Sequence, residues 1–190
     1  MPSLQYNLGY LQACVSDLEA YLLSKTLFWS LGGTIGSYPR FTLGGLLLAL
    51  RLSQAANLTP QQKDDLQKCE AILNASRSRW QVAWGRKSQL EFLSRLRQWQ
   101  NYVNDLIKDP EDQVPYYASE IRLRVFISLL YPEIEKPEEE YLGLLDGLDN
   151  TLRLVFIPGD FIWDENLVDG FPRETFWFLW GMPGSSKSGD

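Results

Sequence analysis

The sequence predicts an all-α protein: an irregular bundle of about five helices around one long central helix, followed by an irregular aromatic C-terminal arm. Three observations predict this fold class. Apolar residues recur at steps of three and four over most of residues 1–155, a stretch of about fifty residues has no internal proline, and the helical periodicity ends near residue 156. We therefore expect a bundle domain over 1–155, an arm packed on it over 156–183 and a disordered tail over 184–190.

The first two helices are predicted from different apolar patterns. Over residues 3–25 the apolar side chains share one face, which is typical of an amphipathic helix; they are Leu4, Leu8, Leu11, Val15, Leu18 and Leu22. Residues 26–39 are rich in glycine and predict a loop. Residues 42–56 are apolar nearly all round and predict a central helix, in which the adjacent Gly44 and Gly45 would let another helix approach closely.

The long central helix is predicted over residues 59–108. Thr59 is a suitable N-cap, and Pro60 suits the first helical position because the N–H that it lacks would need no partner there. Gln62 lies three residues after the cap, as in a capping box. Pro110 marks the end, since the residue before a proline is disfavoured in the α conformation.

The apolar face of this helix changes direction along its length. On a helical wheel one sector holds Leu66, Cys69, Leu73, Trp80 and Trp84. A second sector, about 120° away, holds Phe92, Leu96, Trp99, Val103 and Leu106. Gly85 lies near the change, and glycine weakens a helix by about 1 kcal/mol relative to alanine. We expect the helix to bend or break there, or its two halves to contact different neighbours.

Two shorter helices and the arm complete the prediction. A fourth helix is predicted from Pro115 to about Tyr131 and a fifth from about Pro137 to Leu154, because proline and acidic residues mark their ends. From Phe156 onward an extended piece with a turn is expected. The arm should dock on the bundle, because its aromatic rings exposed together would form an apolar patch that soluble monomers rarely carry.

The periodicity also predicts a set of buried residues, namely Leu46, Leu47, Leu50, Leu73, Trp80, Leu96, Val103, Ile121 and Val125. The chain has 190 residues and is 45% hydrophobic, which is enough to form one sizeable core. Cys14 and Cys69 lie among apolar neighbours and no export leader is evident, so we expect two buried thiols in a cytoplasmic protein.

Charge and composition exclude several kinds of site. The chain has no histidine, which excludes Ser-His-Asp and Cys-His catalysis and histidine-containing zinc sites. Its net charge is −6, but residues 61–108 carry nine bases and five acids, whereas residues 109–190 carry six bases and seventeen acids. This asymmetry is explained most simply by contacts between the two regions, and otherwise by a partner-binding surface.

Three motifs suggest a bound nucleotide or metal and one suggests a membrane span, but none has the residues or the length that such a feature requires. Residues 181–188 approach a P-loop, yet Ser186 replaces a required glycine and no further strands follow to carry the magnesium ligand. The acids of 138–140 point to different helix faces, and those of 160–169 lack the calcium-loop spacing. The apolar run of 41–50 is too short to span a membrane. We expect no cofactor, metal, nucleotide or integral membrane segment.

The absence of a catalytic constellation favours a non-enzymatic protein–protein interaction or assembly protein, with a protein partner or self-association. Two surfaces are candidates for the contact: a row of arginines on the central helix, and the aromatic arm. The candidate partner-binding residues are Arg79, Arg86, Arg97, Trp163, Trp177 and Trp180. The row is expected to face acidic groups, either in the last third of the chain or on a partner, and not nucleic acid.

Two other functions remain open at this stage. The first is a small-ligand binder or enzyme that uses Asp or Glu, Arg and Tyr in a pocket between helices. The second is nucleic-acid binding through the central helix, where arginines alternate with tryptophans, although the acidic net charge opposes it.

Overall fold

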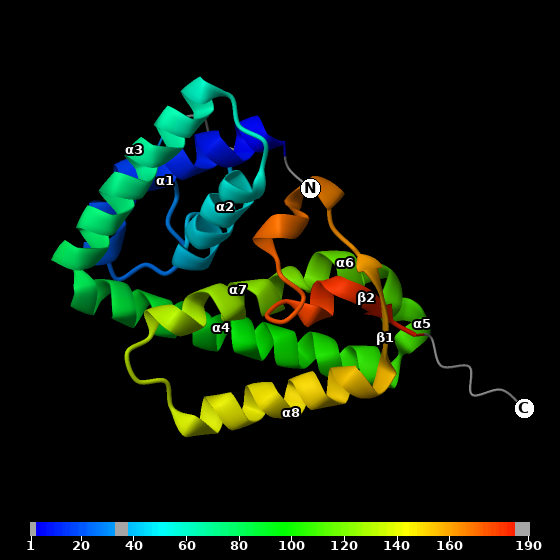
Figure 1. Ribbon diagram of the computed structural model, residues 1–190. Helices are drawn as coiled ribbons and strands as arrows, with labels where there is room; N and C mark the ends of the chain where they lie inside the picture. The colour runs from blue at the N-terminus through cyan, green and yellow to red at the C-terminus, as the bar shows by residue number, and fades with distance from the viewer. Residues whose placement is uncertain (1–2, 33–37, 185–190) are drawn as a thin grey trace, which may run out of the picture.

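The computed structural model describes residues 3–32 and 38–184 and confirms the all-α fold with a C-terminal arm (Figure 1). The helices are α1 (Leu4–Leu23), α2 (Leu43–Ala55), α3 (Pro60–Arg79), α4 (Gln81–Lys108), α5 (Pro110–Gln113), α6 (Tyr117–Glu120), α7 (Arg122–Leu130) and α8 (Glu139–Val155). The strands are β1 (Phe156–Phe161) and β2 (Trp180–Pro183). Short 3₁₀ turns cover Val114–Tyr116, Tyr131–Glu133, Glu165–Gly170 and Trp177–Leu179.

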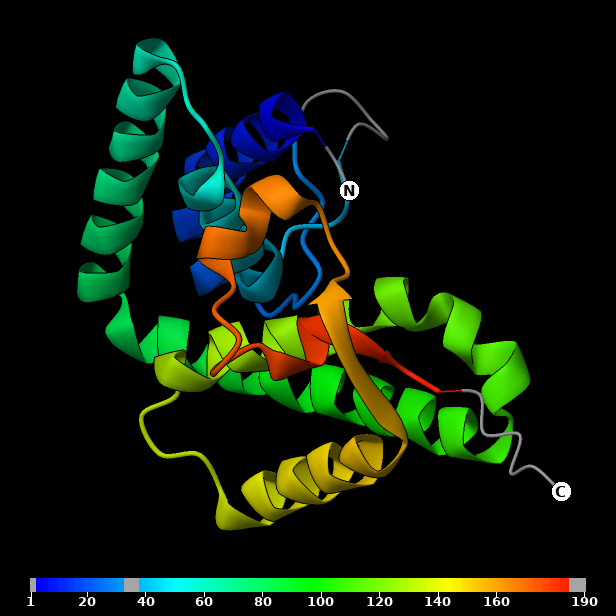
Figure 2. The same cartoon turned by 45° about the vertical axis from the view of Figure 1, so that its right-hand side comes forward.

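The predicted central helix is two helices, α3 and α4, that meet at a sharp bend (Figures 1 and 2). The break lies at Trp80, which leaves the helical conformation at φ −115° and ψ 35°, five residues before the expected Gly85. The predicted start is confirmed, because Thr59 and Gln62 form a reciprocal capping box ahead of Pro60.

The two halves of the central helix contact different neighbours, as the change of apolar face predicted. Helix α3 packs against α1, whereas α4 packs against α7 and α8, which lie on opposite sides of it in both views (Figures 1 and 2). The bend lets α3 follow α1 while α4 lies between α7 and α8 (Figure 1).

The predicted fourth helix is interrupted. Residues 110–133 form α5, α6 and α7, with 3₁₀ turns after α5 and after α7; Ile121 alone separates α6 from α7 and keeps right-handed helical angles, φ −58° and ψ −17°. Helix α7 is fixed by Arg124, whose guanidinium donates to both carboxylate oxygens of Asp149 on α8 at 2.8 and 2.7 Å. Because Arg124 also lies 4.7 Å from the ring centre of Phe178, one side chain joins α7, α8 and the arm.

The arm folds back over the bundle and contributes to its core. Strands β1 and β2 form an antiparallel ribbon in which Ile157 pairs with Met182. The side chains of Phe171, Phe176, Phe178 and Leu179 are buried. The Tyr117 hydroxyl donates to the Phe178 carbonyl at 2.6 Å, and Arg51 of α2 donates to the Gly170 carbonyl. The expected docking of the arm therefore takes place within one chain.

Most residues expected in the core are there, with three exceptions. Leu46, Leu73, Leu96, Val103, Ile121 and Val125 are buried, whereas Leu47, Leu50 and Trp80 are half-buried. Cys14 and Cys69 are buried free thiols, as expected. Residues 185–190, which carry the second half of the near-P-loop and all but the first residue of the expected disordered tail, lie outside the described residues, as do 33–37 of the glycine-rich loop.

Candidate functional site

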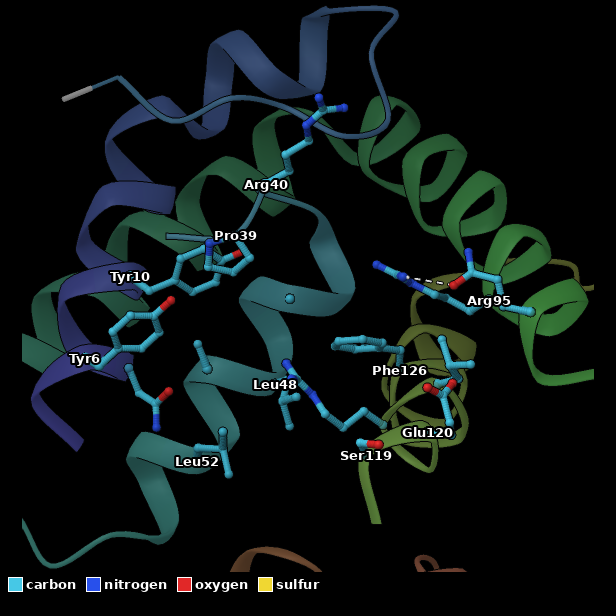
Figure 3. A pocket seen from close by; sticks show the side chains of 16 residues that line it. Tyr6, Tyr10, Pro39, Arg40, Leu48, Leu52, Arg95, Ser119, Glu120 and Phe126 are labelled. Carbon is cyan, nitrogen blue, oxygen red and sulfur yellow. Dashed lines mark hydrogen bonds between the residues drawn. The ribbon is translucent and has the colours of Figure 1, made fainter. Parts of the chain in front are cut away.

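Two concave surfaces have chemistry that a ligand or partner could use. The first, the interhelical pocket, lies between α1, α2, α4 and α7 and has a volume of about 410 Å³. Figure 3 shows Tyr6 and Tyr10 on one side of this pocket, Arg95 and Phe126 on the other, and Leu48 between them. The second is a smaller pocket on the arm.

Arginines dominate the charge of the interhelical pocket. Arg40, Arg95 and Arg122 line it, and Glu120 supplies the one carboxylate among its described lining residues. The guanidinium carbons of Arg95 and Arg122 lie 4.7 and 5.8 Å from the ring centre of Phe126, so two cations converge on one aromatic ring. The pocket wall therefore attracts anions.

The charge of Arg95 is already paired. Its Nε and one Nη donate to the fully buried Glu91 carboxylate at 3.2 and 3.1 Å. Its other Nη donates to the Gln98 side-chain oxygen at 3.4 Å, the hydrogen bond drawn as a dashed line in Figure 3. Arg122 is in a different state, since it forms no ion pair with any described residue. Partial burial of the guanidinium, and then the nearby charge of Arg95, lower the pKa of Arg122 although much of its surface is exposed.

The opposite wall holds a polar group without a partner. Tyr10 is 4% exposed, and its hydroxyl forms no hydrogen bond with the described residues. The Cys14 thiol and the Thr42 backbone lie close to this hydroxyl, but neither contact has the geometry of a hydrogen bond. A Cβ on Gly45 would lie 2.7 Å from the hydroxyl oxygen, so this glycine makes the room that the hydroxyl occupies. Burial raises the pKa of Tyr10 above its ordinary range, which keeps the hydroxyl protonated.

The arm pocket has a volume of about 260 Å³ and combines aromatic walls with two cations. It is lined by Arg153, Phe156, Pro158, Arg173, Trp177 and Trp180. The Arg153 guanidinium lies 3.8 Å from the ring centre of Trp177, and that of Arg173 lies 5.7 Å from Trp180. No carboxylate is among its described lining residues, and neither arginine forms an ion pair with a described residue.

The arm and the end of α8 also carry exposed apolar side chains. Ile157 and its cross-strand partner Met182 are exposed, and Leu154 at the end of α8 is 86% exposed. The ribbon itself is poorly suited to strand addition, because Pro158 in β1 and Pro183 in β2 each lack an N–H donor. A partner here would contact side chains and not the strand edges.

The structure divides the expected arginine row between two helices. Arg79 lies on α3 and forms an exposed pair with Glu19 at 3.8 Å, whereas Arg86 and Arg97 are exposed on α4. The expected row is therefore not continuous along one helix, because the helix breaks at Trp80, although Arg79 and Arg86 still line one surface hollow. Acids of the last third are reached instead by Arg77, which pairs with Glu133.

The three tryptophans also differ in what they offer. Trp177 and Trp180 are half-buried and meet in the arm pocket. Trp163 is 8% exposed and its indole N–H donates to the Ala118 carbonyl at 3.2 Å, so little of its ring is available to a partner. The sequence did not indicate that Arg153 and Arg173 lie against the other two rings, because these contacts join segments of separate elements.

Metal and membrane chemistry have no specific support in the described part of the chain. Residues 3–32 and 38–184 contain no group of three potential metal ligands, and none of their helices combines the length and apolar character that crossing a membrane requires. Comparison with known protein families, curated proteins and solved structures finds no match to this chain. The two pockets are therefore the features of the molecule that bear on its function.

Proposed function

We propose that this chain is a non-enzymatic protein–protein interaction protein, and that its arm pocket captures a partner segment carrying a carboxylate beside an apolar side chain. The observation that supports this is the pair of arginines lying on Trp177 and Trp180 without a carboxylate of their own. Tryptophan and arginine are the side chains most enriched at the energetic centres of protein interfaces.

The chemistry of the pocket determines the kind of segment. An arginine that stacks on an aromatic ring still presents its N–H edge, which suits bidentate binding of a carboxylate. The Trp177 indole N–H donates no hydrogen bond to a described residue and supplies a further donor. Phe156 and Pro158 in the walls of the pocket provide apolar contact area for the neighbouring side chain.

A short acidic segment suits this surface better than a nucleic acid does. Stacked tryptophans and arginines can bind single-stranded bases, but nucleic-acid affinity depends chiefly on neutralising many phosphates. Residues 109–190, which contain the arm, carry seventeen acids against six bases. Their field repels a long polyanion, whereas two arginines suffice to pair with one or two carboxylates.

Panning the immobilised protein against a library of short random peptides tests the proposal. Enriched peptides should contain Asp or Glu next to an apolar residue. Their affinity, measured by fluorescence polarisation, should fall by about tenfold or more in the double variant Arg153→Glu, Arg173→Glu, because attraction becomes repulsion. Circular dichroism and thermal unfolding establish that the variant is folded.

The matched control is the double variant Arg86→Glu, Arg97→Glu, which makes the same charge change on exposed positions of α4. It should leave peptide binding unchanged if the arm pocket is the site. If the α4 variant lost peptide binding while the arm variant kept it, the α4 arginines would be the binding site. Failure to enrich any peptide, or tighter binding of a thymidine oligonucleotide than of every peptide, would contradict the proposal.

A further inference from the structure

We infer that the interhelical pocket is a binding site for a small organic carboxylate with an apolar body, held chiefly by Arg122, with Asn7 and Tyr10 in the facing wall. This site is separate from the arm pocket, and the inference is independent of the proposed protein interaction. Its volume of about 410 Å³ lies within the range of small-molecule sites.

The unpaired polar groups of the pocket point to a ligand. A buried hydroxyl without a hydrogen bond costs free energy, and Tyr10 is such a group in a wall of the pocket. Asn7 lies in the same wall, is 8% exposed, and makes no side-chain hydrogen bond with a described residue. A bound molecule with polar atoms at one end would supply partners to these groups.

The distribution of charge selects an anion with one small head group. Arg95 already uses its donors on Glu91 and Gln98. Arg122 keeps its guanidinium fork, lies near Tyr6 and Tyr10, and is close enough to Arg95 to feel its charge. One free fork matches the two oxygens of a carboxylate, whereas phosphate groups are commonly held by several donors at once.

The remaining walls define the rest of the ligand. Leu48, Ala49 and Leu52 of α2 face the pocket together with Leu123 and Phe126 of α7. Phe126 presents a ring to which both arginines are already attracted. The ligand class is therefore a carboxylate attached to an aromatic or branched aliphatic group, with the apolar part against α2 and α7.

The test is a nuclear magnetic resonance titration with matched probe pairs. Phenylacetate, 3-phenylpropionate and 4-methylpentanoate, each of about ten non-hydrogen atoms, are compared with their neutral amides. The carboxylates should shift the methyl signals of Leu48, Leu52 and Leu123 with dissociation constants of about a millimolar, and each amide should bind about tenfold more weakly. Phenylphosphonate and inorganic phosphate complete the series.

Two variants connect binding to the residues that carry the inference. Arg122→Gln should weaken the carboxylates to the level of their amides, whereas Arg97→Gln on exposed α4 should change nothing. Tyr10→Phe should weaken carboxylate binding severalfold while leaving the ligand-free melting temperature unchanged or higher, because a hydroxyl without a partner is removed. Tyr102→Phe provides the contrast, since its hydroxyl donates to the Gln113 carbonyl at 3.1 Å and its loss should lower the melting temperature.

Three outcomes would overturn the inference. The first is a set of methyl signals that no carboxylate shifts at tens of millimolar, about tenfold above the expected dissociation constant. The second is equal affinity for the acids and their amides, which would show that Arg122 does not recognise the charge of the carboxylate. The third is preference for phenylphosphonate or inorganic phosphate over the carboxylates, which would replace the ligand class.

Discussion

The backbone N–H of Gly44 donates a 2.7 Å hydrogen bond to the carboxylate of Glu91, a residue 47 positions later in the chain. Gly44 lies in the first turn of α2, where N–H groups have no partner inside the helix. Glu91 is fully buried and also pairs with Arg95. One carboxylate thus completes the start of α2 and neutralises a cation beside the interhelical pocket.

Replacing this carboxylate should cost much of the stability of the fold. Glu91→Ala leaves Arg95 unpaired and the Gly44 N–H unsatisfied, and we expect the free energy of unfolding in urea to fall by about 3–5 kcal/mol. Glu91→Gln keeps the shape and one acceptor, so a smaller loss of about 1–3 kcal/mol is expected. A change below about 1 kcal/mol in Glu91→Ala would show that the pair contributes little.

Glycine substitutions should have opposite effects at two helical positions. In Gly44→Ala the new Cβ would lie 2.8 Å from Glu91 Oε1 and 3.2 Å from Phe126, so the variant should be less stable. At Gly147 of α8 nothing lies within 4 Å of the new Cβ. Gly147→Ala should therefore raise the free energy of unfolding by about 0.5–1 kcal/mol, as measured by urea titration.

Arg77 should matter more to stability than its exposed neighbours on the central helices. It contacts the Glu133 carboxylate, which is mostly buried and also accepts the Trp84 indole N–H at 2.8 Å. Arg77→Ala should lower the free energy of unfolding by about 1–3 kcal/mol because a buried carboxylate loses its cation. Arg97→Ala is the control at an exposed position and should stay within about 0.5 kcal/mol; equal losses would contradict the assignment.

Removing the arm beyond Gly170 should disrupt the bundle. The deletion takes away Phe171, Phe176 and Phe178 and leaves the Tyr117 hydroxyl without the Phe178 carbonyl. We expect stronger binding of a hydrophobic dye, a lower melting temperature and association on size-exclusion chromatography. A monomeric truncated chain with an unchanged melting temperature would show that the arm is dispensable for the core.

The protein should lose stability at alkaline pH. Burial is the main cause that raises the pKa of four tyrosines, namely Tyr10, Tyr21, Tyr102 and Tyr117. At a pH above the ordinary pKa of tyrosine, the unfolded chain releases these protons while the folded chain keeps them. The free energy of unfolding therefore falls as pH rises. Each tyrosine contributes about 1.4 kcal/mol per pH unit in that window.

Absorbance of tyrosinate and far-ultraviolet circular dichroism should therefore change together above about pH 10. Tyr117→Phe should move the midpoint to higher pH if the variant folds, because one of the four linked protons is removed. Tyr116→Phe changes a ring that is 60% exposed and should leave the midpoint in place. Ionisation of the buried tyrosines well before the loss of helix would contradict the linkage.

Helix periodicity was sufficient to predict the fold class, because the apolar faces of α1, α2 and α4 are set by local spacing. It was also sufficient to indicate that the central helix serves two sets of neighbours. It could not locate the bend at Trp80, since the position depends on where α3 leaves α1 and α4 meets α7. Glycine propensity indicated Gly85, but tertiary packing decided the position.

The candidate sites depend on contacts that local sequence patterns do not contain. Arg122 and Tyr10 come from α7 and α1 and line one pocket because both helices pack against α2. The helical wheel placed Arg79, Arg86 and Arg97 together by assuming one continuous axis, which the bend removes. The alternative of a ligand pocket between helices named Asp or Glu, Arg and Tyr as residue types without naming the residues, and Glu, Arg and Tyr, but not Asp, line the interhelical pocket.

The long-range contacts of the arm also set the order of events during translation. The hydrogen bond from Arg51 to the Gly170 carbonyl cannot form until the ribosome has added 119 more residues. The bond from the Tyr117 hydroxyl to the Phe178 carbonyl likewise requires a residue 61 positions later. Until residues 170–183 have left the ribosome, the bundle face that they cover is bare apolar surface, which chaperones bind and which promotes aggregation. The nascent chain can therefore complete its core only after almost all of its described length has been synthesised.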